Sequence, residues 1–393
     1  MKDLAVYVHI PFCVKKCNYC DFLSFNASRD IQNKYIDSLI NEIKQAASDF
    51  EDFSIRSVFL GGGTPSLPDA VCISKIMEAL GENYSFSGNP EISMEMNPGT
   101  VTREKLLTYK SAGINRISIG MQSSKDDELK ALGRIHDNQK FLDCYNLVRE
   151  AGFKNVNIDV LSALPGQSFD SYMDTLRQVV SLKPEHISAY SLIIEEGTPF
   201  FDLYGEDATA SEGSGSLPSE DEERRMYHAT KSFLKEYGYE RYEISNYALK
   251  KDCDFSCIHN KAYWTGVDYI GFGLGASSMI ENVRWSNISD LEEYTRLLAA
   301  SDSFSCKKIR CEITPLDEKA QMEEFMFLGL RLTDGISIAG FADRFGKDID
   351  SIYGAVIQKK ISEGLLEKNS DRLRLTEYGM DVSNYVMSEF LLD

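Results

Sequence analysis

The sequence predicts an α/β protein built on a parallel β-sheet. Apolar, β-branched runs alternate with longer segments of helical periodicity through the first half of the 393 residues. Two of the helical segments are followed by Gly113 and Gly152, where a left-handed residue is expected beyond a helix end. This alternation is typical of a parallel sheet with right-handed crossovers.

The apolar spacing also predicts where each element lies. Strands are expected at 4–10, 55–60, 91–96, 115–120, 156–161 and 186–193. Helices are expected between them, at 30–48, 69–80, 102–112, 138–151 and 168–182. The strand–helix unit therefore repeats in order along the chain.

Beyond these elements the character of the sequence changes twice. Residues 205–223 are small, polar and acidic, which predicts a flexible surface loop, with the next helix starting near Ser219. From Asp317 the pattern indicates three helices and a hairpin with its turn at 369–371, which resembles a winged-helix module. We therefore expect a core at 1–237, a segment rich in glycine and aromatic residues at 238–316, and a helical C-terminal domain at 317–393.

Charge and composition exclude several classes of partner. There are 42 basic and 61 acidic residues, and a formal charge of −19 repels phosphate backbones, so we expect no nucleic-acid partner. The pair Lys359 and Lys360 is expected on a solvated helix face. No signal peptide or apolar span is evident, which predicts a cytoplasmic protein that meets a membrane only through membrane proteins. The nine cysteines then favour metal binding or catalysis over disulfides.

Polar and glycine-rich residues follow each of the first five predicted strands. Cys13, Cys17 and Cys20 come directly after the first strand. The later strand ends carry "GGGTPS" at 61–66, "EMNPG" at 95–99, Gln122 with Arg134 beyond it, and Asp159 before "LPGQ" at 164–167. Because the carboxyl ends of parallel strands meet at one face, we expect a single site there.

The three clustered cysteines predict an open metal centre. Their spacing, Cys-x3-Cys-x2-Cys, lets a short loop wrap one soft metal group. Three local ligands leave a coordination position for another residue or for a substrate, as catalytic metal sites require. The alternative is three unrelated buried cysteines, and the close spacing favours the metal centre over it.

These motifs resemble those of the radical S-adenosylmethionine (SAM) superfamily. Within it, the chain is similar to the oxygen-independent coproporphyrinogen III oxidase and its relatives. The shared motifs cover nearly the whole chain: "YVHIPFC", "CDF", "GGGTPS", "GINRISIGMQS", "LGRIH", "LPGQ", "YEISNYA", "HNKAYW", "YIGFGLGASS" and "FMFLGLR".

The resemblance implies a partial (β/α)6 barrel that holds a 4Fe–4S cluster and SAM. Cys13, Cys17 and Cys20 would bind three irons, and SAM would chelate the fourth. The residues matching SAM contacts of the family are Tyr7, Gly62, Gly63, Thr64, Glu95, Gln122, Arg134 and Asp159. His9 matches a histidine near the cluster, but a satisfied core histidine is an equally good interpretation.

Two functions fit this scaffold, an oxidase and a heme chaperone. The oxidase motif continues as Cys-x-Cys, whereas this chain has Phe22 at that position. "HNKAYW" resembles a motif of heme chaperones of the HemW type. On a helix it places His259 and Tyr263 on one face, where both are candidate heme-binding residues. Trp264, the last residue of the motif, could stack on a porphyrin. A packed aromatic helix with an incidental histidine is the alternative for this motif alone. We therefore expect heme and a heme-accepting client protein as partners, with the SAM-dependent oxidase second.

The remaining cysteines allow a second metal site as a weaker alternative. Cys253, Cys257 and His259 could form a loose ligand set, joined by Cys306 and Cys311. Cys72 and Cys144 fall on predicted helices and are expected in the core.

Overall fold

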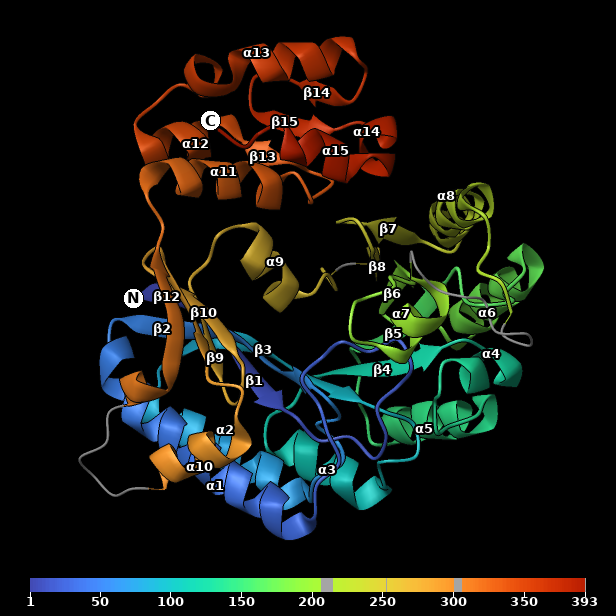
Figure 1. The fold of residues 1–393 in the computed structure, drawn as a ribbon, viewed down its shortest axis with the longest axis vertical. Coiled ribbons are helices and arrows are strands. Elements are labelled where there is room, and N and C mark those ends of the chain that lie inside the picture. Colours follow the sequence, from blue (N-terminus) through green and yellow to red (C-terminus); the bar gives the residue numbers. More distant parts are fainter. Residues whose placement is uncertain (206–214, 252, 300–305, 393) are drawn as a thin grey trace.

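The computed structural model describes residues 1–205, 215–251, 253–299 and 306–392. It consists of a large α/β core with a smaller helical domain at one end (Figure 1). Most of the acidic loop predicted at 205–223 lies outside the described residues. In the described part of the chain, no helix combines the length and apolar character needed to cross a bilayer.

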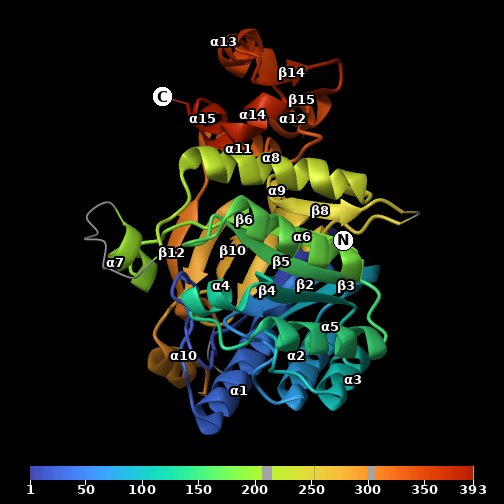
Figure 2. The same cartoon turned by 90° about the vertical axis from the view of Figure 1, so that its right-hand side faces the viewer.

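Six parallel strands form the centre of the core in the order of the sequence. All six predicted strands are present, each a little longer or shorter than expected. They are β1 (Lys2–Ile10), β2 (Phe53–Gly62), β3 (Phe86–Met96), β4 (Arg116–Gln122), β5 (Val156–Ser162) and β6 (His186–Ser191). The curved sheet with helices outside confirms the partial (β/α)6 barrel (Figures 1 and 2).

Amphipathic helices cover the outer face of these strands. The five predicted helices are confirmed as α1 (Arg29–Ala46, followed by a 3-10 turn at Ala47–Phe50), α2 (Ala70–Asn83), α3 (Arg103–Ser111), α5 (Asn138–Glu150) and α6 (Phe169–Leu182). Ser28, Thr102, Asp137 and Ser168 cap four of them by accepting a backbone N–H, which fixes where each begins. α8 (Glu220–Glu236) begins after Ser219, as predicted. The six-residue helices α4 (Asp126–Ala131) and α7 (Pro199–Tyr204) were not predicted, being too short to show periodicity.

Strand alternation separates an apolar outside from a polar barrel interior. On β5, Val156, Ile158 and Val160 are fully buried in the hydrophobic core beneath the helices. Asn157 and Asp159 lie between them and face a cavity inside the barrel. Because successive side chains point to opposite faces, one strand serves both the core and the site.

The segment that follows the barrel extends both edges of the same sheet. Two strands join at the β6 edge, β7 (Tyr239–Arg241) and β8 (Asn246–Leu249). On the other edge β9 (Tyr269–Phe272) runs parallel to β1, followed by antiparallel β10 (Ser277–Ile280), β11 (Val283–Asn287) and β12 (Arg310–Pro315). The short helix α9 (Ile258–Trp264) connects the two edges. Near β12 lie α10 (Leu291–Leu298) and a 3-10 turn at Cys306–Ile309.

The C-terminal domain has its own hydrophobic core. Its elements are α11 (Glu318–Gly329), β13 (Ile336–Ser337), α12 (Ile338–Phe345), α13 (Ile349–Ser362), β14 (Leu366–Lys368), β15 (Arg372–Leu375), α14 (Glu377–Asp381) and α15 (Ser383–Ser388). Helices α11 to α13 and the β14–β15 hairpin agree with the winged-helix-like prediction, whereas the third strand β13 and the short helices α14 and α15 were not predicted.

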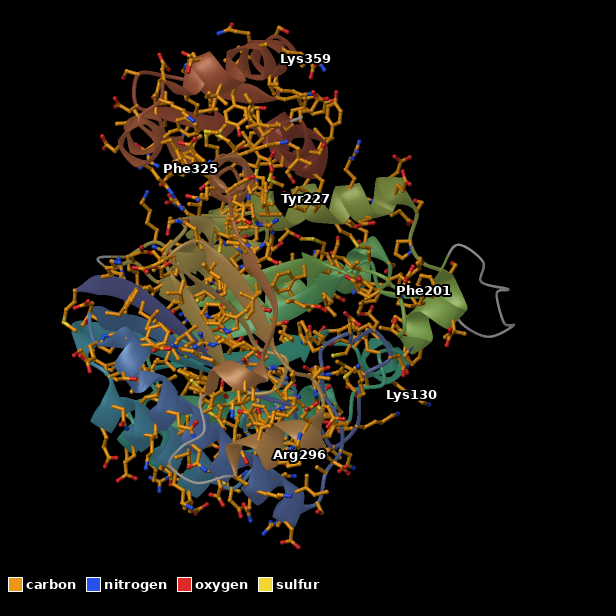
Figure 3. All side chains as sticks on the ribbon, turned by 60° about the vertical axis from the view of Figure 1, so that its left-hand side comes forward. Lys130, Phe201, Tyr227, Arg296, Phe325 and Lys359 are labelled. Carbon is orange, nitrogen blue, oxygen red and sulfur yellow. The ribbon has the colours of Figure 1, made fainter. Side chains whose placement is uncertain are left out.

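One surface prediction in this domain is wrong. Lys359 is exposed on α13, on the side of the domain away from the core (Figure 3). Lys360 instead has a fully buried side chain, whose ammonium group lies 3.0 Å from Glu363 and 3.4 Å from Glu389. Neighbouring residues on a helix point in different directions, so Lys359 reaches solvent whereas Lys360 points into the domain.

Candidate functional site

The three predicted cluster cysteines line one cavity at the carboxyl end of the barrel. The cavity has a volume of about 140 Å³ and is walled by residues that lie within or just beyond the carboxyl-terminal parts of β1 to β5. The loop that carries the cysteines is closed at its base, where Cys13 donates its backbone N–H to Phe25 (3.0 Å) and Phe25 donates to Pro11 (2.9 Å). We expected the strand ends to form a single site, and the three cysteines do share one cavity with residues from the other strand ends.

The glycines after β2 allow this loop to approach the sheet closely. A Cβ atom on Gly63 would lie 2.8 Å from the Phe12 carbonyl and 3.0 Å from Cys13 Sγ. Gly62 has a positive φ of 115°, and a Cβ there would lie 2.7 Å from the His9 ring. A side chain at position 63 would displace the cysteine loop and one at position 62 would displace the His9 ring, which explains why glycine occupies both.

The cysteine loop fits the cluster implied by the resemblance rather than a single metal ion. Within the described residues, no group of three His, Cys, Asp or Glu side chains could hold one metal ion. A 4Fe–4S cluster instead takes each thiolate on a different iron, so its cysteines need only line a common cavity, as these do. When bound, such a cluster supplies the electron that reductive SAM cleavage requires.

A polar frame joins the strand ends beside the cysteines. Arg134 donates to Asn97 Oδ1 (2.7 Å) and to the Gly120 carbonyl (2.8 Å), and its guanidinium lies 3.7 Å from Cys17 Sγ. Asn97 in turn donates to Thr64 Oγ1 at 2.7 Å. Three strand ends are thereby fixed relative to the cysteine loop. Asn97 was not singled out from the sequence, although it lies in the "EMNPG" motif that marks the end of β3.

The predicted acidic residues lie deeper in the same cavity. Glu95 Oε2 accepts the Gly62 backbone N–H at 3.3 Å, and burial raises the pKa of Glu95 to about 8. Asp159 accepts from Asn157 (2.7 Å) and Ser118 (3.1 Å), and burial raises its pKa as well. Such carboxyl groups suit ribose hydroxyls or an ammonium group. Gln122 lines the wall beside them, after a bulge at the end of β4.

A second chamber of about 210 Å³ continues inward from the first. The two share Glu95, Ser118 and Asp159, and the second is also lined by Tyr7, Phe59, Arg116, His259 and Tyr263. Arg116 is 2% exposed and its nearest carboxylate oxygen, on Glu91, is 4.0 Å away. Sequence reasoning missed Arg116, because nothing in "GINRISIGMQS" distinguishes an inward arginine at the start of a strand.

His259 and Tyr263 lie on one face of α9, as predicted. His259 Nε2 is 3.0 Å from Tyr263 Oη, and its Nδ1 is 3.0 Å from Ser57 Oγ. The Phe59 ring stacks on the imidazole with centroids 5.2 Å apart. Burial lowers the pKa of His259 to about 3, so the ring is neutral at physiological pH. The two hydrogen-bond partners, Ser57 and Tyr263, already occupy both ring nitrogens of His259.

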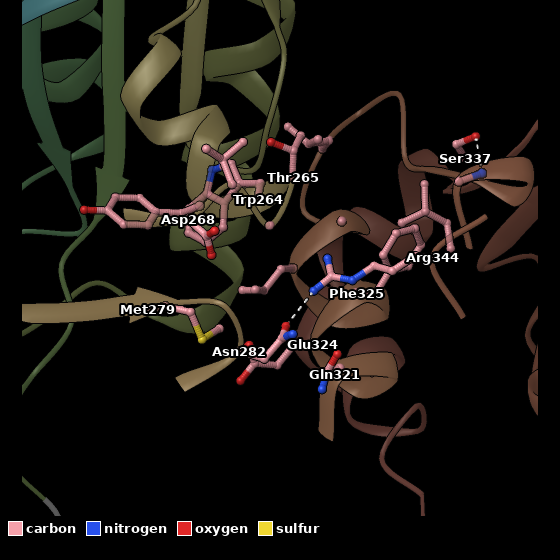
Figure 4. A pocket seen from close by; sticks show the side chains of 18 of the residues that line it. Trp264, Thr265, Asp268, Met279, Asn282, Gln321, Glu324, Phe325, Ser337 and Arg344 are labelled. Carbon is pink, nitrogen blue, oxygen red and sulfur yellow. Dashed lines mark hydrogen bonds between the residues drawn. The ribbon is translucent and has the colours of Figure 1, made fainter. Parts of the chain in front are cut away.

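Trp264, at the end of α9, lines a different cavity. This cavity has a volume of about 400 Å³ and lies between α9, β9, β10 and the helices α11 and α12 of the C-terminal domain (Figure 4). The guanidinium of Arg331 lies over the Trp264 ring, 4.3 Å from its centroid. The HNKAYW motif thus borders both the barrel interior and the interdomain cavity.

The hydrogen bonds of His9 show which of its two interpretations holds. His9 pairs with Tyr7 Oη and the Leu23 carbonyl, both at 2.9 Å, so it is a satisfied residue beneath the cysteine loop.

Among the residues that the structure describes, the alternative second metal site is not assembled. Cys257 is buried against Glu91 at 3.3 Å, whereas Cys311 pairs with Ser286 on the outer strands. Cys72 and Cys144 are buried on helices in the core, as expected.

Known proteins with similar sequences match the whole chain. Residues 7–179 match the radical SAM superfamily, and residues 316–382 match the HemN C-terminal domain. Curated relatives named "Heme chaperone HemW" include those of Lactococcus lactis, 33% identical over 100% of this chain and 98% of the relative, and Bacillus subtilis, 32% identical over 98% and 99%.

A solved structure shares the fold. The coproporphyrinogen III oxidase HemN from Escherichia coli has a TM-score of 0.83 and 23% identity, over 99% of this chain and 90% of its own. With full-length relatives above 30% identity, this chain belongs to the HemW family of the radical SAM superfamily.

Proposed function

We propose that this protein is a heme chaperone, which binds heme and transfers it to client proteins. The observation that carries the proposal is the position of α9, whose His259, Tyr263 and Trp264 border two adjoining cavities. The full-length relatives that are named heme chaperones support the same function.

The second part of the proposal is that the barrel retains a SAM-binding cluster site. Cys13, Cys17 and Cys20 would hold the cluster. SAM would lie against the strand ends, on the residues predicted to bind it: Tyr7, Gly62, Gly63, Thr64, Glu95, Gln122, Arg134 and Asp159. Arg134 would position its neighbours through Asn97, and the near-neutral carboxyl of Glu95 could donate or accept a hydrogen bond.

The oxidase is the weaker candidate. Phe22 stands where the oxidase motif continues with a cysteine, and its side chain is 67% exposed at the mouth of the cluster cavity. An apolar ring there offers neither a metal ligand nor a proton-transfer group. The similarity to the solved oxidase is a similarity of fold.

Heme titration of the purified protein tests the chaperone function. The wild-type chain should bind heme stoichiometrically and pass it to an apo-hemoprotein supplied as acceptor. His259→Ala should weaken or alter the complex, because it releases Tyr263 and Ser57. His228→Ala, on the surface helix α8, is the matched control. An unchanged titration of His259→Ala would remove the proposed role of the motif.

Anaerobic incubation with SAM, a reductant and coproporphyrinogen III distinguishes the two candidates. The chaperone should leave the porphyrinogen unchanged. Formation of protoporphyrinogen IX would instead establish the oxidase function.

A further inference from the structure

The interdomain cavity has an apolar interior. Its wall includes Trp264, Phe325, Leu328 and Ile336, contributed by both the core and the C-terminal domain. Figure 4 shows Trp264 and Phe325 on opposite sides of the space, and Figure 3 places Phe325 on the face of the domain turned toward the core. A cavity of about 400 Å³ with such walls is in the range that takes one flat organic ligand.

The edge of this cavity is cationic. Arg344 and Arg372 are exposed, and in the described part of the chain neither has a carboxylate partner within ion-pair distance. Arg344 donates to Asn282 at 3.2 Å and Arg372 to the Gly335 carbonyl at 3.3 Å, which leaves further donors on each. A third arginine, Arg284, is paired with Glu324 at 2.9 Å, and Asp268 is the other carboxylate of the wall.

We infer that the interdomain cavity binds the porphyrin ring of heme, with Trp264 against the ring and Arg344 and Arg372 pairing with its two carboxylates. The inference rests on the proposed chaperone function and assigns its ligand site. An apolar ring with charged ends matches an apolar cavity with cations at its edge. Arginine is well suited to bind the two carboxylates of the porphyrin, because its planar guanidinium pairs bidentately with a carboxylate.

The barrel chamber is a poorer match for the same ligand. At about 210 Å³ it is half the volume, and it contains Glu95, Asp159 and a neutral His259 whose ring nitrogens are both engaged. His259 then acts as a positioning residue. It holds Tyr263, which forms the wall between the two cavities, and so orients Trp264.

Titration of the full chain with three ligands tests the inference: hemin, metal-free protoporphyrin IX and hemin dimethyl ester, in which the carboxylates are blocked. The double variant Arg344→Glu/Arg372→Glu should weaken hemin and protoporphyrin IX binding about tenfold or more, with little effect on the ester. Leu328→Trp, which fills the cavity, should weaken all three. Lys359→Glu, a charge reversal on the far side of the same domain, should change none.

The outcomes separate this inference from the proposed function. If the wild type and both cavity variants bind hemin equally, heme lies elsewhere and the inference is wrong, while the chaperone function stands. If the double reversal weakens the ester as much as hemin, the carboxylate pairing is wrong. If the wild type does not bind hemin, the proposed chaperone function is wrong, and the inference that rests on it is wrong as well. If the melting temperature of the Arg344→Glu/Arg372→Glu variant shows that this variant misfolds, Arg344→Gln/Arg372→Gln is used in its place.

Discussion

The barrel cavity and the interdomain cavity border the same helix, α9, but are built in opposite ways. The barrel cavity brings ionisable groups into its interior, including Glu95, Asp159 and Arg134, and fixes Asp159 and Arg134 with side-chain hydrogen bonds at strand ends. The interdomain cavity has an apolar interior and keeps Arg344 and Arg372 at its exposed edge. Buried ionisable groups suit a site that must exclude water, whereas exposed charges suit a ligand that has to enter and leave.

The difference predicts that the two sites can be disabled separately. Cys17→Ser should remove nearly all cluster iron, because three thiolates are the only protein ligands expected. Heme affinity should be unchanged, since the interdomain cavity contains none of these cysteines. Iron and sulfide content and a heme titration measure the two effects. Cys253→Ser, at an exposed cysteine, is the control. A parallel loss of heme binding would show that the sites are coupled.

The polar frame of the barrel cavity should matter for SAM and not for heme. Arg134→Gln removes a charged donor from Asn97 and the Gly120 carbonyl. We expect about a 10- to 100-fold weaker SAM affinity in the reconstituted protein, measured by calorimetric titration. Arg177→Gln, which removes a surface ion pair with Asp174, is the matched control. Equal SAM affinity in both variants would mean that Arg134 serves the loop structure alone.

The buried histidine of α9 should make stability depend on pH. The pKa of His259 is lowered to about 3 in the folded chain, against 6.5 for an ordinary histidine. Below pH 6.5 the unfolded chain therefore binds more protons, and the free energy of unfolding falls by up to about 1.4 kcal/mol per pH unit as the pH drops toward 3. Urea unfolding between pH 7.5 and 5.5 should show a steeper decline in the wild type than in His259→Gln. Parallel curves would contradict a neutral buried imidazole.

The smallest expected effect concerns the contact between the domains. Arg284 and Glu324 form an ion pair at 2.9 Å with side chains that are 44% and 12% exposed. Glu324→Gln should lower the free energy of unfolding by about 1 kcal/mol or less. A double-mutant cycle with Arg284→Gln isolates this pair from the rest of the interface. A coupling near zero would leave the apolar contacts as the source of the interdomain geometry.

Sequence patterns predicted the core because they are local. The first six strands and their helices follow from apolar spacing, and the caps at Ser28 and Ser168 fix helix starts. The cysteines and "GGGTPS" are contiguous motifs, so their meeting at one cavity followed from strand order alone. The edge strands β9 to β12 are short and irregular, and the pairing of β9 with β1 joins segments that are far apart in the sequence.

The sequence by itself determined the cysteines predicted to hold the cluster, the glycines that let their loop approach the sheet, and the placement of His259 and Tyr263 on one helical face. Only the tertiary structure decided what those two residues contact, because Ser57 and Phe59 reach His259 from β2, about 200 positions away. It also decided that Arg116 points inward and that Arg344 and Arg372 line one cavity with Trp264 across a domain boundary. Periodicity assigns a residue to a face, but the partner of that face is set by packing between distant segments.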